Sequence, residues 1–556
     1  MNSLPGQRLG YSEVRHKRFG GNVVRVAVIA PPYPLEEAPP LGICYVAAAF
    51  EAAGAQVRIF DYVVAAYSKG KLEKQLKDFK PQVAGSTSVT LNFYQAARII
   101  ADAKAIDPSI ITLMGGPHVS FCAEETLSHS PDIDMVVVRE GEATIADLVP
   151  RLLEKSAWKE VEGIAYREGD SIHITPSRGF LRDLDALPFP ARHLLPLSRY
   201  KAMSYPISII TGRGCPYGCI FCLGRRMVGP RIRVRDMRLV ADEIQGILTM
   251  GFDRINIADD LFTSRQDRVA AFCEEIRKRG LSFGWSAFSR VNTLDRKIAK
   301  MIHDAGCDWV FFGFESGNQE MLDRIGKAAT LEQAQEAVAI CKEVGLRVLG
   351  SFIVGLPGET PQTLRDTDRF ARSLDVSYGY HYLAPFPGTA IMEKTAQYDL
   401  EILSRNWSKY DANQPVVRTS RVSTDDTIRF VERYEKEIEQ LWQELEEGYG
   451  TGVNSPHDDS RVEGRRRIGL VYEILSQDLV EAHGALPPSG PEDPRAALDT
   501  LCERITDATG RGRDMVDDVL GLFVSRGLIE TRKDGESLSW SWTLNPSLTS
   551  NGCAGS

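Results

Sequence analysis

Two rhythms of apolar and polar positions divide the chain. From Val23 to about Lys155, short β-branched runs such as VVRVAVIA and DMVVVREGE alternate with helical stretches such as LGICYVAAAFEAAG. A second alternation starts at Ile207 and comprises six strand-like runs, including RINIA, GWSAFS, WVFFGFES and GYHYLAP. Strands that alternate with helices favour parallel sheets with crossover helices. We therefore predict an α/β protein with a Rossmann-like N-terminal domain followed by a partial (β/α)6 barrel.

The strand rhythm stops after about Lys394. The run TIRFVERYEKEIEQLWQELEEGYG predicts a charged amphipathic helix, and the last part of the chain predicts helices followed by two strands around a turn at Asp534-Gly535. Between the two α/β regions lies a less regular stretch with one hairpin-like run, GIAYREGDSIHIT. We expect an N-terminal extension at 1–22, a Rossmann-like domain at 23–155, a linker at 156–205, a barrel at 206–395, a helical extension at 396–460 and a winged-helix-like module at 461–556.

Composition limits the classes of function. The chain has 556 residues and a formal net charge of -9 at pH 7, which disfavours nucleic acid as a partner. No apolar run approaches the roughly 18 residues needed to span a bilayer, and the N-terminus lacks a secretory pattern. We expect a cytoplasmic protein without a membrane span.

Three of the ten cysteines carry the chemistry. Cys215, Cys219 and Cys222 lie in TGRGCPYGCIFC, just beyond the first barrel strand, where barrel enzymes place their sites. Three thiolates can hold three corners of a cubane cluster and leave the fourth iron open, whereas a structural zinc site needs a fourth ligand. The next cysteine and histidine are Cys273 and His303, so the spacing favours a [4Fe-4S] cluster. The other cysteines are expected to be buried apolar residues: Cys44, Cys122, Cys273, Cys307, Cys341, Cys502 and Cys553.

The CxxxCxxC spacing, with Phe221 before the last cysteine, resembles the signature of the radical S-adenosylmethionine superfamily. The resemblance implies that S-adenosylmethionine chelates the open iron and that electron transfer releases a 5′-deoxyadenosyl radical. It also implies that residues after the later strands contact S-adenosylmethionine. The alternatives are an N-capping role for the aspartates and a surface salt bridge for Arg290. These contacts are Asp259 or Asp260 for the amino group, Ser289 and Arg290 for the carboxylate, and Glu315 near the ribose; Tyr380, His381 and Tyr382 are candidates for substrate contact or for strand packing.

The first domain contains PPLGICYVAAAFEAAG, GSTSVT, GGPHVS and REGEAT in that order. This series resembles the cobalamin-binding domains found upstream of radical S-adenosylmethionine domains. A dinucleotide would require G-x-G-x-x-G after the first strand, where the chain has APPYP. No D-x-H-x-x-G stretch is present, so the resemblance implies cobalamin without a histidine on cobalt. It assigns to the nucleotide tail or corrin edge Ser86, Thr87, Gly115, Gly116, His118, Gly141 and Glu142, with a locally bonded loop histidine as the alternative for His118.

Together the two resemblances imply a methyltransferase that moves a methyl group from S-adenosylmethionine, through methylcobalamin, to an unactivated carbon or phosphorus. They also imply an external electron donor of the flavodoxin or ferredoxin type, and a small-molecule or peptide substrate. One alternative is a cyclase, rearrangement or redox enzyme with the same cofactors. Another is a cobalamin-sensing or partner-binding protein that uses the C-terminal module. That module carries more Asp and Glu than Lys and Arg, which suits a protein or peptide partner better than DNA.

Overall fold

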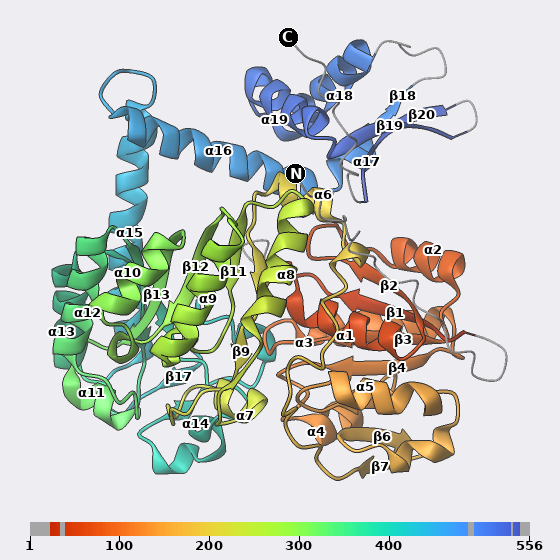
Figure 1. The fold of residues 1–556 in the computed structure, drawn as a ribbon, viewed down its shortest axis with the longest axis horizontal. Coiled ribbons are helices and arrows are strands. Elements are labelled where there is room, and N and C mark those ends of the chain that lie inside the picture. The colour runs from red at the N-terminus through yellow and green to blue at the C-terminus, as the bar shows by residue number, and fades with distance from the viewer. Residues whose placement is uncertain (1–22, 34–38, 487–493, 535–536, 545–556) are drawn as a thin grey trace, which may run out of the picture.

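The structure is a computed structural model that describes residues 23–33, 39–486, 494–534 and 537–544. The expected N-terminal extension 1–22, Cys553 and the turn residue Gly535 lie outside these ranges. Two α/β units lie side by side, and a long helical arm leads from the second unit to a small C-terminal module (Figure 1). The predicted fold class, a Rossmann-like domain followed by a partial barrel and a helical C-terminal region, is confirmed.

The first unit is a seven-stranded sheet in the order β2-β1-β3-β4-β5-β6-β7. Its first five strands are parallel, and the order reverses direction between β1 and β3, where doubly wound sheets bind ligands. Helices α1 and α5 pack together on one side and α2 and α3 on the other. The elements are β1 Arg25–Ala30, α1 Leu41–Ala52, β2 Gln56–Asp61, α2 Lys69–Phe79, β3 Val83–Thr87, α3 Phe93–Ile106, β4 Ile111–Gly115, α4 Ala123–His129, β5 Met135–Val137 and α5 Glu142–Leu148.

The sheet extends beyond the boundary that the sequence suggests at residue 155. Strands β6 (Ile164–Glu168) and β7 (Ser171–Ile174), which form the hairpin-like run, continue it past β5 in antiparallel orientation. The reason is physical: β5 is short, and its outer edge would expose unpaired backbone groups without a neighbour. Only the later part of the expected linker, with α6 (Leu197–Ala202), connects the two units.

The second unit is a parallel sheet of six strands in the order β15-β14-β13-β12-β11-β8. Because β8 and β15 do not pair, the barrel is open. A two-stranded ribbon of β9 and β10 flanks the cysteine segment. The elements are β8 Ile207–Ile209, β9 Gly212–Arg213, α7 Gly224–Val228, β10 Arg233–Val234, α8 Met237–Thr249, β11 Arg254–Ile257, α9 Gln266–Lys278, β12 Gly284–Ser289, α10 Arg296–Asp304, β13 Cys307–Glu315, α11 Gln319–Arg324, α12 Leu331–Val344, β14 Arg347–Val354, α13 Pro361–Leu374 and β15 Ser377–Tyr382.

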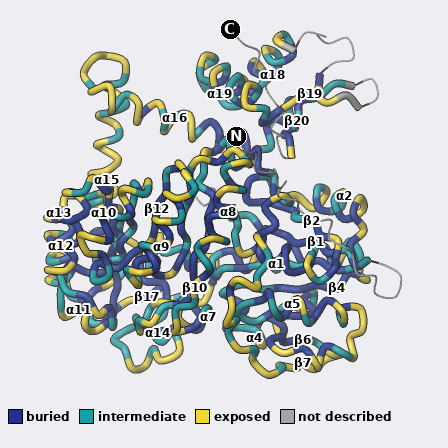
Figure 2. Tube along the Cα trace, viewed as in Figure 1, coloured by how far each residue is buried: buried dark blue, intermediate teal, exposed yellow. Residues whose placement is uncertain are grey.

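Local sequence explains the helix starts of the barrel. Thr330 and Thr360 accept hydrogen bonds from backbone N–H groups in the first turns of α12 and α13, and both helices have a capping box. Asp295 caps α10 in the same manner. The predicted long helix is α15 (Thr424–Gly448), which begins at a capping box formed by Ser423 and Asp426. Much of α15 and of the following helix is exposed, whereas the strands of both sheets are mostly buried (Figure 2).

The C-terminal module consists of three main helices and a three-stranded antiparallel sheet in the order β18-β20-β19. This helix and strand order agrees with the predicted winged-helix-like arrangement. Among the described residues, no helix is both long and apolar enough to cross a membrane. The elements are α16 Pro456–Ser476, α17 Leu479–His483, β18 Ala485–Leu486, α18 Pro494–Thr509, α19 Arg513–Ser525, β19 Ile529–Asp534 and β20 Ser537–Trp542.

One continuous hydrophobic core joins the two α/β units. Residues of α1, such as Ile43 and Phe50, and residues of the barrel, such as Ile207 and Val240, belong to the same buried cluster. The Cys44 carbonyl of α1 accepts a hydrogen bond from the Ala191 backbone N–H at 3.0 Å. Helix α1 therefore packs on the first sheet and belongs to the core that continues into the barrel unit.

Candidate active site

The three clustered cysteines lie on one loop at the carboxyl end of β8. Backbone hydrogen bonds order this loop: the Cys215 N–H donates to the Gly229 carbonyl at 3.2 Å, and the Cys222 N–H closes a turn within the loop by donating to the Cys219 carbonyl at 3.2 Å. Between them, the Ile220 N–H bonds the Ile325 carbonyl at 3.1 Å. Cys222 is exposed and the other two are half-buried, so all three thiols line an accessible loop rather than a packed core.

The loop suits a cluster better than a single ion. No three His, Cys, Asp or Glu side chains of the described residues converge as ligands of one metal ion, and a cubane does not require this because each thiolate binds its own iron. A side chain at Gly224 would place its Cβ 3.6 Å from the Cys222 Sγ and 2.9 Å from Asp260 Oδ1, so a glycine keeps that space open. Part of the Cys222 side chain reaches solvent, but the surrounding protein partly desolvates its thiol and raises its pKa to about 11, so its thiolate form depends on iron displacing the proton.

The guanidinium of Arg290 lies against the cysteine loop. One of its nitrogens is 3.6 Å from the Cys219 Sγ, its Cζ lies 3.7 Å from the centre of the Tyr217 ring, and another nitrogen donates to the Lys327 carbonyl. Arg290, which the sequence predicts to bind a carboxylate, thus already contacts a sulfur, an aromatic ring and a backbone carbonyl. Its charge stabilises the thiolate that a cluster requires. Ser289 is buried and shares a 2.5 Å contact with the Thr263 hydroxyl.

The two aspartates after β11 have different surroundings. Asp259 is buried and accepts hydrogen bonds from Thr211, from the Gly212 N–H and from the guanidinium of Arg268. Its oxygens are therefore occupied within the protein. Asp260 is exposed, and its Oδ2 accepts one hydrogen bond from the Gly214 N–H at 3.0 Å. Of the two alternatives that the sequence leaves open, Asp260 is the carboxylate that an ammonium group can reach.

At the end of β13, Glu315 forms a buried ion pair. Its Oε1 lies 2.7 Å from the Lys327 Nζ, and both side chains are less than a tenth exposed. The residue has a φ of 65°, a left-handed conformation that is uncommon for a residue with a side chain. A Cβ at Gly313 would come within 2.3 Å of the same oxygen, so the strand needs a glycine there. Strain of this kind is concentrated at functional sites in proteins.

The three polar residues of the last barrel strand separate into two groups. Tyr380 is buried and packs against Phe430 and Tyr434 of α15, at centroid distances of 4.9 and 5.1 Å. Tyr382 is also buried, whereas His381 is exposed. Strand packing thus accounts for the two tyrosines, and His381 alone is accessible to a substrate.

A second site, an apolar slot, lies at the carboxyl ends of β3, β4 and β5, beneath α1 and α5. Apolar side chains such as Val28, Ile43 and Leu113 line it, and Gly116 closes on Thr87 so tightly that a Cβ would lie 2.6 Å from the Thr87 hydroxyl. An aromatic base on a flexible tail suits a narrow apolar slot with hydroxyl and glycine residues at its mouth. Of the seven residues expected at the cobalamin tail or corrin edge, the slot brings together Ser86, Thr87, Gly115, Gly116 and Gly141.

His118 does not line this slot. It is 1% exposed and packs between Phe93 and Trp407, with ring centroids 4.4 and 5.2 Å away. Burial lowers the pKa of His118 to about 4, so the ring is neutral at physiological pH. Its Nδ1 lies 3.4 Å from the Thr90 hydroxyl, which is the local bonding that the alternative interpretation of the sequence anticipated.

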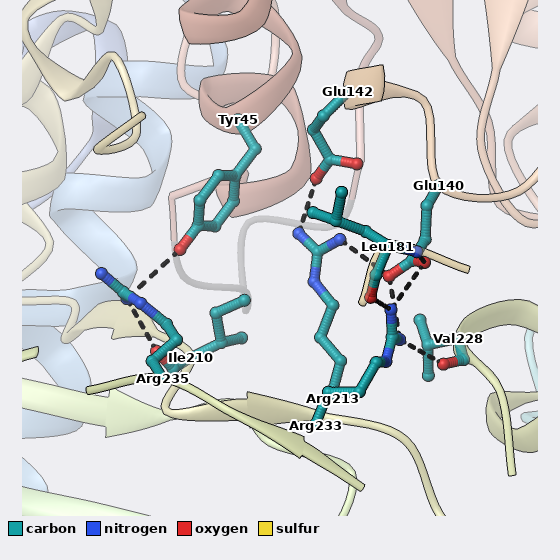
Figure 3. A network of polar contacts seen from close by, with 9 residues as sticks. All are labelled: Tyr45, Glu140, Glu142, Leu181, Ile210, Arg213, Val228, Arg233 and Arg235. Carbon is teal, nitrogen blue, oxygen red and sulfur yellow. Dashed lines mark hydrogen bonds and ion pairs between the residues drawn. The ribbon is translucent and has the colours of Figure 1, made fainter. Parts of the chain in front are cut away.

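An ionic network of Glu140, Glu142, Arg213 and Arg233, shown in Figure 3, lies between the slot and the cysteine loop. Glu140, directly after slot residue Arg139, pairs with Arg213 at 3.0 Å and with both terminal nitrogens of Arg233. Glu142 pairs with Arg213 at 2.6 Å. Since Arg213 precedes Cys215 by two residues, the two sites are mechanically linked.

Most of this network is not predicted from the sequence. The sequence assigns Glu142 to the cofactor and does not single out Glu140, Arg213 or Arg233. Two signals were present: a charged pair, Arg139-Glu140, stands directly after a buried strand, and the run RIRVR places arginines at every second position, as on one face of a strand. Neither signal predicts which residue forms the ion pair, because the paired residues are distant in sequence.

Replacing Glu140 by glutamine is expected to lower the free energy of unfolding by about 3 kcal/mol, because buried arginines then lose their counter-charge. A matched control is Glu393→Gln, which removes an exposed pair with Arg226 that has the same two-bond geometry. That change is expected to cost about 0.5 kcal/mol or less. Urea denaturation followed by tryptophan fluorescence measures both, and equal losses would show that the Glu140 network does not hold the units together.

Comparison with known proteins gives matches for both regions. Residues 209–371 match the Radical SAM superfamily, and residues 34–149 match the B12 binding domain. An uncharacterized methyltransferase, PH0819 of Pyrococcus horikoshii, is 35% identical over 398 residues, which cover 71% of this chain and 86% of that protein. An anaerobic magnesium-protoporphyrin IX monomethyl ester cyclase of Rubrivivax gelatinosus is 29% identical over 404 residues, which cover 70% and 72%.

A solved structure shows the same fold over most of the chain. The cobalamin-dependent S-adenosylmethionine radical enzyme OxsB, with aqua-cobalamin and S-adenosylmethionine bound, superposes with a TM-score of 0.64. The superposition covers 90% of this chain and 84% of OxsB at 17% sequence identity. The likeness therefore includes the arrangement of the two α/β units and extends into the C-terminal region.

Proposed function

We propose that this chain, which belongs to the cobalamin-dependent radical S-adenosylmethionine enzymes, transfers a methyl group from S-adenosylmethionine to an unactivated carbon or phosphorus of a biosynthetic intermediate. The observation that carries the proposal is the network of Glu140, Glu142 and Arg213. It fixes the cobalamin slot and the cysteine loop at one junction between the two sheets. A reaction that needs both cofactors at one substrate requires such a junction. The curated relative PH0819, named a methyltransferase, supports the direction of the chemistry.

In this proposal, each predicted site residue has its own role. Cys215, Cys219 and Cys222 hold the [4Fe-4S] cluster, and Arg290 stabilises the cluster thiolate nearest to it. Asp260 receives the ammonium of S-adenosylmethionine, because a carboxylate with free oxygens suits that group. When bound, the cluster supplies the electron that cleaves S-adenosylmethionine, and cobalamin carries the methyl group.

The remaining residues position the ligands or enclose the cobalamin tail in this proposal. Glu315, held by Lys327, presents a fixed carboxylate beside the expected ribose position. The residues of the apolar slot hold the cobalamin tail: Ser86, Thr87, Gly115, Gly116 and Gly141. His381 is the barrel-strand residue that we assign to substrate contact. Glu142 acts as a positioning residue through Arg213 rather than through a cofactor, and His118 stabilises the loop after β4.

An external protein of the flavodoxin or ferredoxin type supplies the electrons in this proposal. Among the described cysteines, those outside the loop are scattered and form no second cluster site that could relay an electron. The exposed side of Cys222 marks where a donor approaches. All described cysteines are free, which suits a reducing compartment such as the cytoplasm.

A second candidate reaction is ring closure or another oxidation with the same cofactors, and the similarity to the Rubrivivax cyclase favours it. The two reactions differ in the fate of the methyl group. Reconstituted protein is incubated with a reductant, trideuteromethyl-labelled S-adenosylmethionine and fractionated small molecules from cells that make this protein. Methyl transfer predicts 5′-deoxyadenosine together with a product that carries the label. Formation of 5′-deoxyadenosine with an oxidised, unlabelled product would favour ring closure instead.

A further inference from the structure

The C-terminal module is docked on the side of the barrel opposite to the cysteine loop. Arg199 of α6 pairs with Asp478 at 3.0 Å, and Lys71 of α2 pairs with the same carboxylate at 2.8 Å. Met203, just after α6, is part of the module's own core. Since β8 begins a few residues later, at Ile207, the module faces the amino ends of the barrel strands. The module is therefore remote from the two cofactor sites.

A large cavity separates the module from the barrel. Its volume is about 1380 Å³. On the barrel side, its walls are the turns that lead into β11 and β12, including Phe252 and Ser282; on the module side, they are the end of α19 and alternate residues of β19. The cavity is open to solvent and lies at the amino-end face, which in barrels ordinarily serves stability rather than catalysis.

Strand β19 has one unpaired edge beside this cavity. Its hairpin partner is β20, and it is the last strand in the order β18-β20-β19 of the described residues. The Thr543 N–H bonds the Leu528 carbonyl at 2.9 Å, which defines the hydrogen-bonded positions of this antiparallel pair. Because these positions alternate, the backbone groups of Ile529 and Thr531 point away from β20. Within the part of the chain that the structure describes, the outer edge therefore carries a row of donors and acceptors without a strand partner, a template for one more strand.

The register also says which side chains an added strand would place in the cavity. Glu530 and Arg532 line the cavity together with Leu528, which also packs into the core of the module, whereas Ile529 packs into that core and does not line the cavity. In a strand added beside β19, every second side chain would point to the same face as Glu530 and Arg532. Backbone pairing would thus supply affinity, and the cavity would select alternate side chains.

The charge of the cavity selects the chemistry of those side chains. Its basic residues outnumber its acidic ones, although the whole chain is acidic. Arg254 forms an ion pair with Asp308, and Arg532 forms one with Glu530. Lys201 lies over the Phe252 ring rather than beside a carboxylate, and Arg526 is exposed at the end of α19. These two cations favour acidic side chains in the occupant.

We propose that an acidic segment of a separate polypeptide binds here in extended conformation, pairs with the outer edge of β19 as a fourth strand, and directs alternate acidic side chains toward Lys201 and Arg526. The site goes beyond methyl transfer, since it lies apart from both cofactor sites. It gives the C-terminal module the role of holding a polypeptide partner on the enzyme.

Fluorescence anisotropy with the full chain, loaded with both cofactors, tests this site. The probe is a labelled peptide of about ten residues with alternating Asp and Thr, a length that matches a strand with short flanks. Two comparison probes alternate Lys and Thr, or carry N-methyl groups at every second amide of the acidic sequence. The acidic probe is expected to bind at least about tenfold more tightly than either comparison probe, because one or two charge-assisted or backbone hydrogen bonds are lost in each. Equal binding of the three probes, or no binding of the acidic one, would overturn the proposal.

Thr531→Pro tests the edge itself. Proline removes the outward N–H and is tolerated on edge strands at such positions, so the β19–β20 pairing is retained. Its matched control, Thr531→Val, keeps the N–H. The proline variant is expected to weaken the acidic probe about tenfold and the valine variant to leave it unchanged. Both should release 5′-deoxyadenosine at the wild-type rate, and a proline variant that binds the probe normally would refute strand addition.

Arg526→Glu supplies an independent readout, because this residue is exposed and its replacement does not disturb the strand. It is expected to weaken the acidic probe and to strengthen the Lys and Thr probe. Unchanged preference between these two probes would exclude the charge selection proposed for the cavity.

Discussion

The variant Cys219→Ala is expected to lose reductive cleavage of S-adenosylmethionine by about a thousandfold or more. Loss of a group that merely supports a metal ligand already costs about 10- to 100-fold, and this change removes a ligand itself. Cys219 is also the thiol that Arg290 contacts, at 3.6 Å, so the variant leaves that guanidinium without its partner. The measurement is the amount of 5′-deoxyadenosine released by anaerobically reconstituted protein with excess reductant.

Two controls make the result specific. Cys122→Ala replaces a half-buried thiol outside the loop and is expected to keep wild-type cleavage; burial raises the pKa of that thiol to about 12, as for a structural cysteine. Cobalamin binding by Cys219→Ala should remain near the wild-type level, since the slot residues belong to the other sheet. If the folded Cys219 variant still cleaves S-adenosylmethionine, or if it loses cobalamin as well, the division into two cofactor sites is wrong.

Filling the slot should have the second large effect. Gly42 lies in the first turn of α1 and lines the slot, and a Cβ placed on it meets no protein atom within 4 Å. Gly42→Leu should therefore occupy space meant for the cobalamin tail without a clash in the protein. Cobalamin affinity is expected to fall about 10- to 100-fold, or about 1.4 to 2.8 kcal/mol. Equilibrium dialysis with hydroxocobalamin measures the change.

Gly70→Leu is the matched control for this variant. Gly70 is also the second residue of its helix, α2, also has open space around its Cβ, and does not line the slot. Both substitutions should raise helix stability slightly, because leucine is a better helix former than glycine by roughly 1 kcal/mol. Equal cobalamin affinity of the two variants would place the cofactor elsewhere.

The sequence predicts those parts of the molecule that depend on short-range pattern. Strand and helix alternation gave both α/β units, because buried parallel strands must be apolar throughout. The spacing of Cys215, Cys219 and Cys222 predicts the cluster loop that we propose, since the three ligands would be local in sequence. Glycine and hydroxyl residues at strand ends identified most of the slot, because strand ends of a parallel sheet meet at one edge.

Short-range sequence pattern does not predict which residues pair when they are far apart in the chain. Asp259 and Asp260 are adjacent in sequence and chemically identical, and only the distant Arg268 and Thr211 distinguish the satisfied carboxylate from the accessible one. The sequence predicts a cofactor contact for Glu142 and does not predict its ion pair with Arg213. The hairpin of β6 and β7 falls in the expected linker because the sequence does not show that β6 pairs with β5. In each case a tertiary neighbour decides the role.

In the proposed reaction, cobalamin held in the slot accepts the methyl group of S-adenosylmethionine. The most direct test supplies reduced, cobalamin-loaded protein with trideuteromethyl-labelled S-adenosylmethionine and measures by mass spectrometry the methyl group on the extracted cobalamin. We predict label on cobalamin, with S-adenosylhomocysteine as the other product, in the wild type and Gly70→Leu and much less in Gly42→Leu. Cobalamin that is bound and reduced in the wild type but remains unlabelled would contradict the claim.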